Sequence, residues 1–123
     1  MVQQPQLRVE NLTRGQTLVW AGCVADTFWA SLRGLIGHKP LVAGEGLILV
    51  PSNSIHTHFM GFPIDVLYVD KAQQVVAVDH DMAPWRFGRI HRRAHFVLEL
   101  PAGAIAASGT QVGDQLEVQG YRF

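Results

Sequence analysis

Short apolar stretches follow one another along this chain with only tight turns between them. Residues 46–50 are wholly apolar, residues 64–69 are apolar except for one aspartate, and residues 75–79 return after a turn at Asp70 and Lys71. Strands joined by tight turns pair antiparallel, whereas a parallel sheet needs a helix-sized crossover between its strands. The pattern therefore predicts a mainly β fold.

The predicted architecture is an antiparallel β-sandwich or partly closed barrel of about eight strands with two short helices. One helix is expected over residues 26–36, ended by Gly37, and the other between Pro101 and Gly109. The chain is short enough to form a single domain over residues 1–123. The expected strands cover residues 6–10, 16–21, 46–50, 55–61, 64–69, 75–79, 96–100 and 116–123.

The charge balance and the cysteine count exclude several classes of protein. Lys+Arg and Asp+Glu both count 10, which argues against a dedicated binder of nucleic acid or anionic membranes. Cys23 is the single cysteine, so no internal disulfide can form, and its apolar neighbours favour a small core residue over a nucleophile. No apolar run has the length of a signal peptide or a membrane span, so a cytoplasmic location is expected.

Two histidines and a methionine stand at alternate positions, as His56, His58 and Met60. On the expected strand their side chains would share one face, where imidazoles could bind Zn, Cu or Ni and a thioether would favour Cu(I). Asp65 or His80 could complete such a transition-metal site. The favoured alternative has a hydrogen-bonded structural His56, an exposed His58 and a Met60 that fills the core.

Asp65 and Glu99 are lone carboxylates within apolar strands. A buried carboxylate must be paired or must shift its pKa, so the two could form an acid/base pair. The favoured interpretation is that they form ion pairs with Arg33 and Arg86 and thereby hold the frame of the fold.

The segment from residue 82 to residue 93 is polar, aromatic and irregular, which predicts a long surface loop. Basic and aromatic residues alternate there, a combination that can contact anions or polymers, although a solvated loop balanced by Asp79 and Asp81 is favoured. No recognition helix is visible, so sequence-specific DNA binding is not expected. The residues concerned are Trp85, Arg86, Phe87, Arg89, His91, Arg92 and Arg93.

A set of short motifs between Arg33 and Val118 resembles, in order and spacing, the small bacterial and archaeal proteins of the family called domain of unknown function 192. The resemblance implies a mainly β fold and no established reaction, cofactor or partner. Some relatives are associated with pilus or secretion loci. The family usually has an apolar residue where His58 stands and a larger residue where Gly61 stands. The matching pieces are Arg33–Gly37, Gly44–Leu47, Ile55–Thr57, Met60, Phe62–Val66, Pro84–Arg86, Val97–Gly103 and Val112–Asp114.

The leading hypothesis is a non-enzymatic β-domain that binds a small ligand or a protein partner through residues 53–65, with the 82–93 loop as a rim. One alternative is a metal-binding protein or metal-dependent enzyme that uses His56, His58 and Asp65. Another is an accessory module of a pilus or cell-envelope assembly. The residues expected to contact the ligand are His56, His58, Met60, Trp85 and Arg86.

Overall fold

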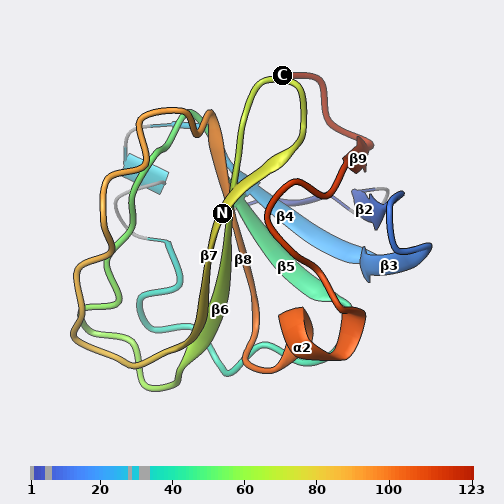
Figure 1. Ribbon diagram of the computed structural model, residues 1–123. Coiled ribbons are helices and arrows are strands. Elements are labelled where there is room, and N and C mark those ends of the chain that lie inside the picture. Colours follow the sequence, from blue (N-terminus) through green and yellow to red (C-terminus); the bar gives the residue numbers. More distant parts are fainter. Residues whose placement is uncertain (1, 5–6, 28, 31–33) are drawn as a thin grey trace.

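A computed structural model describes residues 2–4, 7–27, 29–30 and 34–123, whose strands form two sheets (Figure 1). The larger sheet has the order β1–β4–β5–β8–β6–β7 and the smaller has the order β3–β2–β9. The strands are β1 (Val2–Gln4), β2 (Arg8–Asn11), β3 (Gln16–Val19), β4 (Ala21–Ala25), β5 (Glu45–Leu49), β6 (Ile64–Val69), β7 (Val75–Met82), β8 (Phe96–Pro101) and β9 (Leu116–Gln119).

The hydrophobic runs of the sequence become the centre of the larger sheet. Every residue of β6 is buried, and β8 is buried over residues 96–100, as expected for strands covered on both faces. The predicted β6–β7 hairpin is present, and the Asp70 carboxylate accepts the amides of Ala72 and Gln74 in its turn. The predicted mainly β fold is confirmed, and the described strands form no closed barrel.

One strand pair departs from the antiparallel prediction. β4 and β5 run parallel, with Ala21 opposite Glu45 and Ala25 opposite Leu49. The chain leaves β4 and returns to the same end of the sheet through residues 26–44, which is long enough for the crossover that a parallel pair needs. The strand predicted over residues 16–21 is divided in the structure: β3 ends at Val19 in the smaller sheet, and the separate strand β4 begins at Ala21 in the larger sheet.

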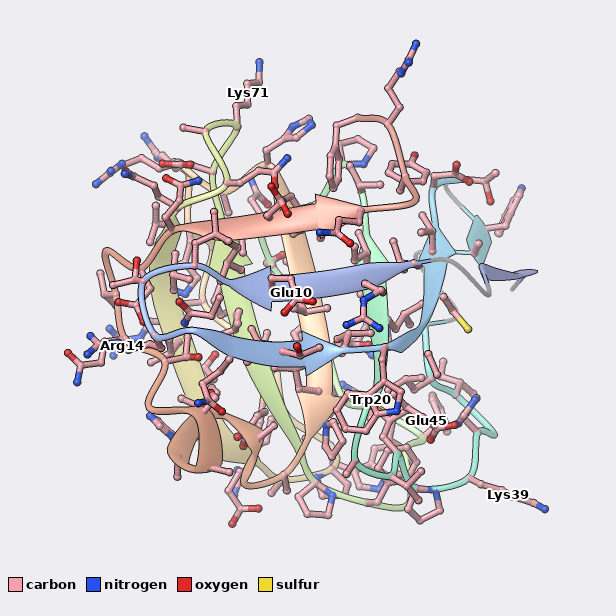
Figure 2. The ribbon with its side chains drawn as sticks, turned by 90° about the vertical axis from the view of Figure 1, so that its right-hand side faces the viewer. Glu10, Arg14, Trp20, Lys39, Glu45 and Lys71 are labelled. Carbon is pink, nitrogen blue, oxygen red and sulfur yellow. The ribbon has the colours of Figure 1, made fainter. Side chains whose placement is uncertain are left out.

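The larger sheet has a separate hydrophobic core on each face. The first core lies between the two sheets and includes Val9, Ile48 and Leu98. Figure 2 looks onto the outer face of the smaller sheet, with Glu10 pointing outward and the larger sheet behind it. The second core, which includes Leu49 and Val97, lies on the opposite face, where long connecting segments cover the sheet on the left of Figure 1.

The helix after Pro101 is confirmed as α2 (Ala104–Ser108), and Gly109 ends it in the left-handed conformation. The helix predicted over 26–36 falls partly on residues outside the described ranges. Within them, the Ala30 amide donates to the Thr27 hydroxyl at 3.1 Å, as a capping residue would arrange it. No helix of the described residues is long and apolar enough to cross a membrane.

The strand predicted over residues 55–61 is wrong. The segment forms only an isolated bridge between His56 and Phe87, and it then turns at Phe59, whose φ is 64°. Alternation along a strand therefore does not place His56, His58 and Met60 together. Their arrangement depends on this irregular loop and on its contacts with residues 83–91.

Candidate functional site

Glu99 lies in the middle of β8, and the alternation of that strand determines where its side chain points. Leu98 and Leu100 belong to the core between the sheets, whereas Val97 belongs to the core on the opposite face. Because neighbouring side chains on a strand point to opposite faces, Glu99 points the same way as Val97. It enters the face covered by the connecting segments, and it is 2% exposed.

Within the part of the chain that the structure describes, one oxygen of the Glu99 carboxyl lacks the partner that a buried acid normally has. Its Oε1 atom has no hydrogen-bond partner among the described residues. Burial raises the pKa of Glu99 to about 8, because apolar surroundings disfavour the charged form. At neutral pH the group is therefore mostly a protonated acid that can donate and accept a hydrogen bond. Buried polar groups without partners are rare, and they concentrate at functional sites.

This carboxyl lines a cavity of about 480 Å³, a volume in the range of small-molecule sites. The walls are mainly apolar and come from four parts of the chain: Thr27 with residues 34–36, the end of β5 with the segment after it, the 82–93 loop and β8. The lining residues are Thr27, Gly34, Leu35, Ile36, Leu49, Pro51, Ser52, Ser54, Ile55, His56, Met60, Phe87 and Glu99.

Backbone hydrogen bonds fix the outer wall of the cavity. Residues 53–57 run beside the 83–91 segment, where Gly88 donates its amide to Ile55 at 2.8 Å and His91 donates to Asn53 at 2.8 Å. This pairing brings Phe87 opposite His56, and both side chains line the cavity. The predicted association of the 53–65 segment with the 82–93 loop is thus present, but as irregular loop pairing.

The two histidines have different surroundings. The Nδ1 atom of His56 accepts the backbone amide of His58 at 3.2 Å. The His58 ring lies against two aromatic rings, 4.4 Å from Phe87 and 5.6 Å from Trp85 between centroids. The buried Nδ1 of His58 has no hydrogen-bond partner within the described part of the chain. His56 therefore belongs to the cavity wall, and His58 supports the aromatic residues at its mouth.

The aromatic rim is held in an unusual backbone conformation. Phe59 and Trp85 both have φ of 64°, which large side chains rarely adopt, and their rings lie 4.7 Å apart. They remain 65% and 57% exposed, and Phe87 beside them is 81% exposed. Strained residues of this kind persist only where surrounding contacts determine them, and they cluster at ligand-binding sites.

Thr57 supplies those contacts. Its side chain is buried, and its hydroxyl donates to the Ala83 carbonyl at 2.6 Å and accepts the Arg86 amide at 2.9 Å. Its backbone amide donates to the Arg86 carbonyl, and its carbonyl accepts the Trp85 amide. One threonine therefore fixes the loop that carries the rim.

A metal site built on His56 and His58 receives no support from the donor arrangement. The Nδ1 atom of His56 already accepts the backbone amide of His58. Asp65 points to the other face of the sheet, and His80 is exposed on β7. No group of three His, Cys, Asp or Glu side chains among the described residues could hold a metal ion.

The expected ion pairs of Asp65 and Glu99 are not found within the described chain. Asp65 is 1% exposed and accepts three backbone amides: from Asp81 at 2.8 Å, Gly103 at 3.1 Å and Ile105 at 2.8 Å. Backbone donors take the place of the arginine because β6 begins beside α2, whose first amides need acceptors.

Arg86 is exposed and forms no ion pair with a described residue. Arg33 lies outside the described residues, so its pairing with one of the two carboxylates stays a prediction. Cys23 is half-buried, and burial raises the pKa of its thiol, with a smaller contribution from Glu45. A raised pKa disfavours the thiolate, which agrees with a packing role for this cysteine.

The sequence analysis missed the role of Glu99 in the cavity and the role of Thr57 in the rim. The position of Glu99 within an apolar strand was visible, but the strand pattern does not show that the covering segments leave a space above it. Thr57 carried no signal, because its partners lie 26 to 29 residues away.

The geometry can be compared with known proteins. The family model of domain of unknown function 192 (DUF192), described as an uncharacterized ACR, matches residues 10–118. A UPF0127 protein of Thermococcus sibiricus is 35% identical over 114 residues, covering 87% of this chain and 71% of that protein. A UPF0127 protein of Pyrococcus furiosus is 34% identical over 110 residues, covering 87% of this chain and 94% of that protein.

Two solved structures share the fold. One is a protein of unknown function from Novosphingobium aromaticivorans, with a TM-score of 0.78 and 22% identity over 90% of this chain and 82% of that one. The other is described as a putative transcription regulator from Sinorhizobium meliloti, with a TM-score of 0.76 and 20% identity over 91% of each chain. At these identities the likeness establishes the fold alone.

Proposed function

Because the chain belongs to the DUF192 family, whose description names no activity, we propose its function from the site itself: the domain binds a small, largely apolar molecule in the cavity above Glu99. The observation that carries this proposal is the carboxyl of Glu99, which is buried, faces the cavity and has an oxygen without a partner among the described residues. A ligand would supply that partner.

The lining supports this function. Leu35, Leu49, Ile55 and Met60 offer apolar contacts, and burial of such surface is the main source of affinity for a small ligand. Glu99 adds a single polar contact that would orient the molecule. The proposed site thus combines apolar walls with an orienting polar group, a combination found in small-molecule sites.

The aromatic rim supports the same function. Phe87 lines the cavity, is 81% exposed, and is packed against His58. An exposed aromatic side chain at the edge of an apolar cavity can cover a bound ligand. In this proposal His56, Met60 and Phe87 contact the ligand, whereas His58 and Trp85 hold the rim, and the exposed Arg86 lies beside it.

The test is a titration of the protein with indole, a neutral apolar probe, followed through methyl resonances of labelled methionines. Met60 lines the cavity, whereas the half-buried Met82 lies on β7 outside it and serves as the internal control. We expect saturable shifts at Met60 with Met82 unchanged. An unshifted Met60 up to about 1 mM indole, a concentration that detects weak affinities, would contradict the proposal.

A further inference from the structure

We infer that the ligand of this cavity is a cation: a small apolar molecule that carries a protonated amine and pairs with the carboxylate of Glu99. The inference rests on the proposed binding function and names the chemical class of the ligand. Its starting point is the charge of the described lining, in which Glu99 is the single acidic residue and no lysine or arginine is present.

The unpartnered oxygen selects among ligand classes. An anionic ligand would place a second negative charge beside a buried acid, which disfavours binding. A neutral ligand could share a hydrogen bond with Glu99. An ammonium group can do more, because it donates to the carboxylate and compensates its charge in surroundings where a lone charge is strongly disfavoured.

Binding of such a cation must displace a proton. With a pKa of about 8, the Glu99 carboxyl is mostly protonated at pH 7. The balanced step is carboxylic acid plus ammonium giving carboxylate–ammonium pair plus one proton released to solvent. Below the pKa of Glu99, the affinity for the amine should therefore fall about tenfold for each unit by which pH decreases.

Other titratable groups near Glu99 must be considered as sources of that proton. Among the described residues they are His56 across the cavity, Tyr68 on β6, Asp79 on β7 and Glu45 on β5. The Tyr68 hydroxyl donates to Asp79 at 2.7 Å, and burial with this bond raises the pKa of Tyr68 far above neutral pH. A variant at Glu99 separates proton release at this carboxyl from release at any of the other groups.

The experiment is calorimetric titration with three probes that share one indole body: tryptamine, the neutral tryptophol and the anionic indole-3-acetate. Comparison of two buffers with different ionisation enthalpies gives the number of protons released. We expect tryptamine to bind tightest and to release about 0.9 proton at pH 7. Glu99→Gln should weaken tryptamine by at least about tenfold, abolish proton release and leave tryptophol within about twofold.

The control is Glu117→Gln, which removes one negative charge from the exposed face of β9 and should leave all three affinities unchanged. Tryptophol binding as tight as tryptamine, or tryptamine binding without proton release, would overturn the cationic ligand while the binding function stands. Failure of all three probes to bind would overturn both proposals.

Discussion

Asp65 and Glu99 are buried carboxyl groups on adjacent strands, and the two faces of the larger sheet give them opposite surroundings. The register pairs Val66 with Glu99 and Asp65 with Leu100, so the two acids lie one position apart but point to opposite sides. Asp65 accepts three backbone amides near α2, whereas Glu99 faces an apolar cavity. The first acid is used by the fold, and the second is available to a ligand.

The largest expected effect is that of Asp65→Ala. The substitution leaves the amides of residues 81, 103 and 105 without their acceptor, the last of them buried and the other two part-buried. A buried unsatisfied donor costs about 1–3 kcal/mol and a part-buried one less, so we expect the free energy of unfolding to fall by roughly 3–5 kcal/mol. Chemical denaturation measures this change.

The matched control is Asp70→Ala, which also removes a carboxylate that accepts two backbone amides, but in an exposed turn. Because water can replace that acceptor, the free energy of unfolding should fall by about 1 kcal/mol or less. Equal losses of stability for the two variants would show that Asp65 stabilises the fold no more than an exposed carboxylate does. The contrast with Glu99 would then fail.

The next effect is the dependence of stability on pH that Glu99 produces. Its pKa is raised from 4.5 to about 8 in the folded protein, so the folded state binds the proton that the unfolded state has lost. Stability therefore falls as pH rises through this window, by about 3 kcal/mol between roughly pH 5 and pH 7.5. Glu99→Gln should remove this fall while other groups keep theirs.

Asp114 titrates in the opposite sense and outside this window. Hydrogen bonds from Arg14 and Asn11 hold the pKa of Asp114 at about 2, so its stabilisation is lost as pH falls toward that value. Denaturation at several pH values above pH 5 therefore separates the contribution of Glu99 from that of Asp114. If stability does not change with pH and Glu99→Gln leaves it unchanged, a cation must compensate the charge of Glu99. Arg33 is the candidate that the sequence suggests.

The features of the fold and of the two acids that can be predicted from sequence are those that depend on neighbouring residues. Apolar runs, the Asp70 turn and Gly109 placed β5, β6, β8 and α2 correctly, because strand burial and helix termination depend on adjacent residues. The same reasoning identified Asp65 and Glu99 as buried acids. It could not assign their partners, since these depend on which face of the sheet each acid occupies and on what covers that face.

The covering segments explain the remaining errors. Residues 55–61 alternate in a manner typical of a strand, but their hydrogen bonds go to an irregular loop about 30 residues later, and Phe59 adopts a positive φ. Neither feature has a local signal. The cavity itself exists only because these segments do not fill the space above Glu99, which no property of a single stretch of sequence can show.

Thr57→Val tests whether the rim of the Glu99 cavity is held from one point. Valine keeps the shape of the side chain but loses the hydrogen bonds to the Ala83 carbonyl and the Arg86 amide. We therefore expect the free energy of unfolding to fall by about 2 kcal/mol. Trp85 fluorescence should also report a more mobile rim. Thr17→Val is the control, because its hydroxyl contacts Glu10 on the exposed face and its loss should cost less than about 0.5 kcal/mol.

The smallest effect is expected at Gly61, which follows Met60 of the cavity wall and precedes Asp65. A Cβ at this position meets nothing within 4 Å, and its φ is not left-handed. Gly61→Ala should therefore raise the free energy of unfolding by about 0.5 kcal/mol, through lower entropy of the unfolded chain. At Gly37, which is equally open but has φ of 73°, alanine should instead lower it by about 1 kcal/mol.

Indole titration of Gly61→Ala sharpens the boundary between the two regions. The cavity wall ends at Met60, and Gly61 is exposed and does not line it. Affinity should then remain within about twofold of the parent protein, a change below roughly 0.4 kcal/mol. A larger change would mean that the ligand extends beyond Met60 along the chain toward β6. The boundary between the ligand-binding region and the structural region would then have to move toward the start of that strand.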